Sequence, residues 1–141
     1  MSKFAKLLLA SVVAFAFGAA LAQDAEPTPT VEFTLHGSIG STGFQFVGVG
    51  GDIDGLVNPD LNVKVGDVVK VNVISDGMPH DFAIDALDVK SDPATVAEEG
   101  VSIVFTVTEE GTYVYYCTTP GHALPDVGVG MFGNFIVGAA E

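Results

Sequence analysis

Apolar and polar residues alternate along several short stretches of the chain. A period of two places apolar side chains on one face of an extended segment and polar side chains on the other. Val69, Val71 and Val73 are expected to point inward, and the polar residues between them outward. The pattern predicts β-strands at residues 31–36, 61–65, 68–74, 81–90, 101–108, 113–117 and 132–137.

Glycine and proline divide these stretches into short segments. Gly66 and Asp67 are a hairpin-like turn signal between two predicted strands. Residues 37–55 are so rich in glycine that they predict short, irregular strand pieces or a covering loop, and residues 91–100 predict a loop or one helical turn. Many short strands with such turns indicate an all-β domain, an antiparallel sandwich or barrel.

The N-terminus has the pattern of an export signal. Two lysines precede an apolar run at residues 7–21, which ends in small residues suited to cleavage. We therefore predict a signal peptide at residues 1–22, a flexible leader at 23–30 and one domain at 31–141. The run is shorter than the roughly 20 residues of a membrane span, so we expect a periplasmic or secreted protein without stable membrane insertion. An uncleaved anchor is the alternative.

The charge balance is strongly acidic. There are 18 Asp and Glu residues against five Lys and Arg, and the formal net charge is −13. Cleavage after residue 22 leaves only Lys64, Lys70 and Lys90 as cations. This balance excludes nucleic acid as a partner, because nothing would neutralise its phosphates. A basic docking partner is the electrostatic complement, but an acidic surface that serves only solubility is the favoured explanation.

Candidate metal ligands follow one another near the C-terminus. The predicted strand at residues 113–117 ends in Cys117, a Thr-Thr-Pro-Gly turn leads to His122, and Met131 precedes the last predicted strand. His80 adds a second imidazole from another loop. Alone, a Cys or a Met is usually buried packing, but two imidazoles, a thiolate and a thioether together select copper in electron-transfer sites.

The two remaining observations fit this interpretation. His36 has no partner at ligand spacing, so we expect it to be structural or exposed. Cys117 is the single cysteine, and an unpaired thiol is a hazard in an oxidising compartment unless a metal or partner occupies it.

These segments resemble the cupredoxins, the family of type 1 or blue copper domains. The resemblance spans about residues 31–137 and is carried by residues 58–67, 80–82, 114–122 and 130–133. It implies a Greek-key β-sandwich or barrel with one copper ion bound by His80, Cys117, His122 and Met131. Two departures stand out: eight residues separate His122 from Met131, more than in similar members, and Asp81 occupies a position that is often Asn.

The resemblance implies a one-electron carrier rather than an enzyme. In such proteins the histidine of the C-terminal loop reaches the surface, so we expect redox partners to dock transiently on a monomer near His122, beside the apolar residues around Leu124. Copper binding and delivery is an alternative. A nitrite reductase-like subunit is less favoured, because Tyr116 stands where those enzymes have a second-site histidine and only His36 remains unassigned.

Overall fold

The computed structural model describes residues 26–96 and 100–140. The predicted signal peptide lies outside this range and stays a prediction. Residues 26–30, the described part of the predicted leader, are exposed and lie outside the strands. Within the described residues, no helix is long and apolar enough to cross a membrane.

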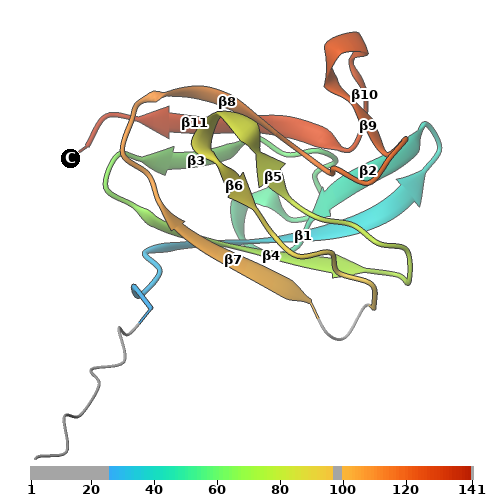
Figure 1. Cartoon of the computed structure of the whole chain (residues 1–141), viewed down its shortest axis with the longest axis horizontal. Helices are drawn as coiled ribbons and strands as arrows, with labels where there is room; N and C mark the ends of the chain where they lie inside the picture. The colour runs from blue at the N-terminus through green and yellow to red at the C-terminus, as the bar shows by residue number, and fades with distance from the viewer. Residues whose placement is uncertain (1–25, 97–99, 141) are drawn as a thin grey trace, which may run out of the picture.

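Two sheets pack against each other (Figure 1). The first has the strand order β2-β1-β4-β7. Its inner strands β1 and β4 run parallel, while β1 with β2 and β4 with β7 are antiparallel. Its strands are β1 (Val31–Gly40), β2 (Gly43–Gly48), β4 (Val68–Ser75) and β7 (Val101–Thr106).

The second sheet has the order β3-β11-β8-β5-β6. Here β3 and β11 are parallel and the other pairs antiparallel. Its strands are β3 (Leu61–Lys64), β5 (Ala83–Ile84), β6 (Val89–Lys90), β8 (Gly111–Tyr116) and β11 (Phe132–Gly138). A small hairpin, β9 (Ala123–Leu124) with β10 (Val129–Gly130), projects between β8 and β11.

The core lies between the two sheets. Val69, Val71 and Val73 are fully buried, which confirms the inward face predicted for β4. Tyr115 of β8 is also fully buried; its ring stacks on Phe82 and its hydroxyl donates to the carbonyl oxygen of Pro59. The all-β sandwich is thus confirmed, with parallel pairs where the alternation predicted antiparallel ones.

Three local predictions need correction. The turn at Gly66 connects β3 and β4, which belong to different sheets, so it is not a hairpin. The glycine-rich segment contains the regular strand β2, and β1 continues to Gly40 to pair with it. Residues 81–90 form two short strands around a 3-10 turn at Asp85–Leu87, not one strand. The alternation of apolar and polar residues indicates which face of a strand is buried, but it does not indicate which strands are its neighbours in the sheet.

Candidate metal centre

His80 lies in the loop between β4 and β5. Its backbone exchanges two hydrogen bonds with Ala94, of 3.0 and 2.8 Å, which fix the loop against the segment that follows β6. Its imidazole packs on Gly37 of β1, where an added Cβ would lie 2.4 Å from Cδ2 of the ring. Glycine at position 37 therefore makes room for the buried histidine.

Cys117 follows directly after the last residue of β8. Its backbone N–H donates to the carbonyl oxygen of Met131 at 3.1 Å, so pairing with the chain before β11 continues past the end of the strand. The Cys117 side chain is buried. A thiol at the end of a paired strand is held in one place, as the sequence predicted.

His122 closes the turn that follows Cys117. Its N–H donates to the carbonyl oxygen of Thr119 at 3.0 Å, and its own carbonyl accepts from the N–H of Met131 at 2.9 Å. Gly130 makes this close approach feasible, because an added Cβ would lie 2.2 Å from the His122 carbonyl oxygen. The turn thus returns His122 toward Cys117.

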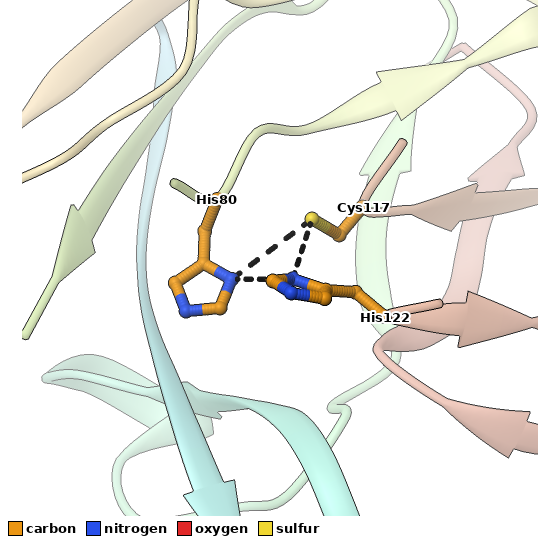
Figure 2. Close-up of side chains that lie close together, drawn as sticks. All are labelled: His80, Cys117 and His122. Carbon is orange, nitrogen blue, oxygen red and sulfur yellow. Dashed lines mark hydrogen bonds between the residues drawn. The ribbon is translucent and has the colours of Figure 1, made fainter. Parts of the chain in front are cut away.

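The three side chains converge at one point (Figure 2). Sγ of Cys117 lies 3.7 Å from Nδ1 of His122 and 4.0 Å from Nδ1 of His80, and the two Nδ1 atoms are 3.1 Å apart. Ligands on a common ion, with bonds of about 2.0–2.3 Å to nitrogen and sulfur, would be separated by about 3.3–3.8 Å. The Cys117–His122 separation lies within this range and the other two lie about 0.2 Å outside it, so small side-chain shifts bring all three atoms onto one metal ion.

Met131 is completely buried beside this cluster. Its backbone bridges the other two residues of the C-terminal loop, through the hydrogen bonds to Cys117 and His122 described above. The eight residues before it form the β9–β10 hairpin with a 3-10 turn at Pro125–Val127, which accounts for the extra length of the loop. The long loop therefore returns Met131 to the cluster.

Burial sets the protonation of the three converging residues. It is the main cause that lowers the pKa of His80 and of His122, and it raises the pKa of the Cys117 thiol. Backbone N–H groups of Asp81 and Thr119 oppose the shift at Cys117 by hydrogen bonding to the sulfur. Neutral imidazoles are the form that binds a metal, and a bound cation would also deprotonate the thiol. The donor set therefore fits a copper ion.

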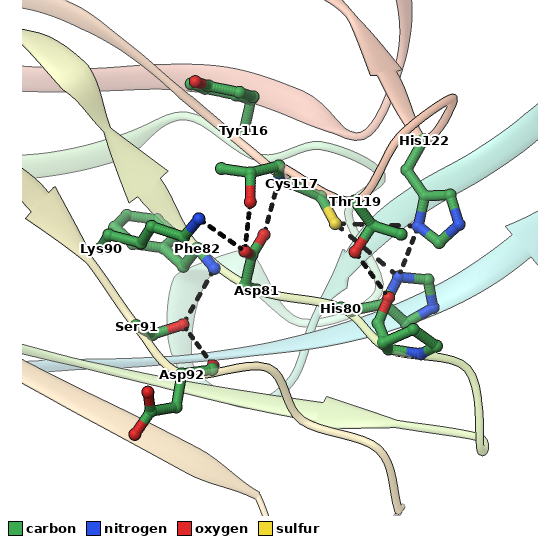
Figure 3. A network of polar contacts seen from close by, with 12 residues as sticks. His80, Asp81, Phe82, Lys90, Ser91, Asp92, Tyr116, Cys117, Thr119 and His122 are labelled. Carbon is green, nitrogen blue, oxygen red and sulfur yellow. Dashed lines mark hydrogen bonds and ion pairs between the residues drawn. The ribbon is translucent and has the colours of Figure 1, made fainter.

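Asp81 joins the His80 loop to the Cys117 loop (Figure 3). Its buried carboxylate accepts hydrogen bonds from the backbone N–H and the hydroxyl of Thr118. Lys90 of β6 lies on its outer side, with Nζ 3.7 Å from Oδ2. A second connection runs from the hydroxyl of Thr119 to the carbonyl oxygen of Pro79, at 2.9 Å. These hydrogen bonds fix the His80 loop and the Cys117 loop relative to each other.

Two expectations about the histidines have different outcomes. His36 lies outside the cluster and pairs with Asp76 at 2.9 Å, as expected for a residue without a ligand role. His122, however, does not reach the surface: only 4% of it is exposed, and its ring stacks on Phe44 with the centroids 3.8 Å apart. The expectation of an exposed His122 is wrong because β2 covers it.

Sequence reasoning missed two residues that support the centre. Phe44 carries no sequence signal for its contact with His122, since nothing in the alternation of β2 shows which loop it meets. Asn58 accepts from the N–H of Phe46 and donates to the carbonyl oxygen of Gly130, both at 2.9 Å, with a φ of 47°. An Asn before a proline is a turn signal, but its partners are visible only in the fold.

Comparison with known proteins points to copper. The family model of copper-binding proteins of the plastocyanin/azurin family matches residues 49–138. A sequence search among curated proteins gave no match.

Solved structures of low sequence identity share the fold. Auracyanin A, a blue copper protein from Chloroflexus aurantiacus, has a TM-score of 0.53 at 18% identity, covering 76% of this chain and 98% of its own. Rusticyanin from Thiobacillus ferrooxidans gives 0.55 at 23%, covering 79% of each chain. The copper-containing nitrite reductase of Thermus scotoductus gives 0.54 at 23%, covering 79% of this chain but 28% of the enzyme.

Proposed function

Because the chain belongs to the plastocyanin/azurin family of copper-binding proteins and is therefore a cupredoxin, we propose that it carries single electrons between redox partners in the periplasm or outside the cell. The observation that carries this proposal is the convergence of His80, Cys117 and His122 within 4.8 Å of one another in a buried position. Copper bound there supplies one-electron chemistry by alternating between Cu(I) and Cu(II).

The protein's own residues have defined tasks in this proposal. Copper would be held by the neutral imidazoles of His80 and His122 and by the sulfur of Cys117, with the thioether of Met131 as the fourth ligand. The ties through Asp81 hold the ligand loops together, so that little has to move when an electron arrives or leaves. The buried setting excludes water from these side chains.

Burial also favours electron transfer over the alternatives. A catalytic metal site keeps an open position for its substrate, whereas these ligand side chains are almost fully enclosed. Within residues 26–96 and 100–140, His80, Cys117 and His122 are the only group of three or more His, Cys, Asp or Glu residues placed closely enough to hold a metal ion. Copper delivery needs exposed ligands that exchange the metal. Nitrite turnover by the purified, copper-loaded protein would overturn the preference for a carrier.

The partner surface is proposed beside the His122 loop. Leu124, Val127 and Val129 of the β9–β10 hairpin are exposed by 55%, 70% and 51%. Exposed apolar residues grouped in this way suit a small, transient interface. We expect a monomer that meets redox partners through this patch, with a basic partner favoured by the net charge of −13.

Electron self-exchange of the copper-loaded protein tests this function. Leu124→Asp should slow the exchange by about tenfold, because a carboxylate in an apolar contact disfavours the encounter, while the visible spectrum stays unchanged. Val49→Asp, at an exposed position after β2 beside Glu32 and Thr34, is the matched control and should leave the rate unaltered. An altered spectrum with normal exchange in Leu124→Asp would refute the assignment of the patch.

A further inference from the structure

The His122 imidazole is enclosed by a strand that supplies no metal ligand. Phe44 of β2 stacks on it with an interplanar angle of 21° and a centroid distance of 3.8 Å. The same phenyl ring meets His80 edge-on, at 6.1 Å and 64°. Phe44 therefore touches both imidazoles, and it touches His122 face to face.

The β1–β2 hairpin explains why a phenyl ring lies there. Phe44 and Phe46 alternate onto the inner face of β2; Phe46 is fully buried in the core and Phe44 is half-buried at the rim. Gly37 lies opposite Phe46 in the pairing and provides the space that His80 fills. One hairpin thus makes room for His80 and covers His122.

The outer edge of Phe44 faces a surface cleft. This cleft separates β2 from the hairpin that follows His122, and its lining includes Phe44, Val57, Val129 and Phe132. β10 contacts β2 directly across it. Phe44 lies between the cleft and the His122 ring, so reagents that approach from this side meet the phenyl ring first.

We infer that Phe44 is a positioning residue which closes the outer side of the copper centre, holding the His122 imidazole by stacking and shielding it from solvent. The inference rests on the proposed function in that His122 is taken as a copper ligand. A ring that served only as general packing would stabilise the whole domain, and would not change the reactivity of one histidine relative to the others.

Covalent labelling of the metal-free protein tests the shielding without any copper. Diethyl pyrocarbonate modifies neutral imidazoles, and peptide mass spectrometry follows each histidine separately. In Phe44→Ala, modification of His122 should accelerate by about tenfold relative to that of His36. Losing one aromatic stack raises the population of accessible His122 by about this factor. Phe44→Trp keeps a stacked ring and should stay within about twofold of the native rate.

Two further variants keep the test decisive. Phe105→Ala removes another half-buried ring, 5.7 Å from Phe135, and should leave the ratio of His122 to His36 labelling unchanged. Phe44→Leu retains apolar bulk without a planar ring, and it gives the same acceleration if the alanine variant does not fold. Equal acceleration at all three histidines, or none at His122 in either variant, would overturn the inference.

A second measurement separates this inference from the proposed function. Transfer of copper from the loaded protein to a strong chelator should be faster in Phe44→Leu than in the native protein and in Phe105→Ala. Selective labelling of His122 without any copper binding would retain the shield but refute the electron carrier. Accelerated labelling with an unchanged rate of copper loss would overturn the role of Phe44 at the metal.

Discussion

Both histidines of the centre have backbone hydrogen bonds, but they differ in the side-chain contacts that surround them. On the His80 side, backbone pairing with Ala94 and the carboxylate of Asp81 fix the loop through polar contacts. On the His122 side, a phenyl ring covers the imidazole, and the hairpin beyond it exposes Leu124 and its apolar neighbours. One side is built for rigidity, and the other combines shielding with an apolar surface that partners can meet.

The difference follows from where each loop lies in the sandwich. The His80 loop is joined to β6 and to the end of β8, so its polar backbone groups are surrounded by protein and must find partners there. The His122 loop leads into a projecting hairpin, so apolar cover from β2 adds to the backbone hydrogen bonds that His122 makes with Thr119 and Met131. Removing parts of each side in turn tests whether this division is real.

The largest effect is expected when the Asp81 carboxylate on the His80 side is removed. Asp81→Ala leaves the N–H and the hydroxyl of Thr118 without their acceptor, which should lower the free energy of unfolding of the metal-free protein by about 2–3 kcal/mol. Denaturant unfolding followed by circular dichroism measures it.

Asp81→Asn is the matched control for that change. The amide can still bond to Thr118, so its loss should be at most about half that of the alanine variant. If Asp81→Ala unfolded at the native denaturant concentration, the carboxylate would not be what ties the two ligand loops.

An intermediate effect is expected from pH. Burial lowers the pKa of His80 and His122 from the ordinary 6.5, so the unfolded chain takes up protons that the folded metal-free protein excludes. The stability is therefore fully present above about pH 6.5 and is lost as the pH falls toward the lowered pKa values, by at most about 1.4 kcal/mol per pH unit for each histidine. Denaturant unfolding between pH 7.5 and about 5.5 measures this slope.

The two sides should contribute unequally to that slope. After burial, His122 and then His36 further lower the pKa of His80, although the carboxylates of Asp81 and Asp76 oppose them; at His122, Asp81 opposes burial and no neighbouring histidine adds to it. His80→Gln should therefore flatten the pH dependence more than His122→Gln does. Equal slopes in both variants and in the native protein would show that neither histidine is buried as described.

The smallest effect is expected at the outer end of the polar side. Lys90 is 60% exposed and 3.7 Å from Asp81, so Lys90→Gln should cost at most about 0.5 kcal/mol of unfolding free energy. Lys70→Gln, which breaks a pair with the exposed carboxylate of Glu32 at 3.1 Å, is the control for a lysine whose partner is not buried. A loss several times larger at Lys90 would mean that the buried carboxylate depends on the lysine, and not on Thr118.

Much of the centre could be predicted from local order in the sequence. Cys117, the turn and His122 are close along the chain, so strand and turn signals are enough to bring them together. The tie from Asp81 to Thr118 and the stack of Phe44 on His122 join distant segments. Such contacts depend on which strands become neighbours, and alternation is silent on this, as the parallel pairing of β1 with β4 shows.

Titration of the metal-free protein with Cu(II), followed by visible absorption, tests the central claim most directly. We predict an intense thiolate-to-copper band that saturates at one copper per chain, disappears in Cys117→Ser and persists in His36→Gln. A band that survived in Cys117→Ser, or its absence from the native protein, would contradict convergence of His80, Cys117 and His122 on one copper ion.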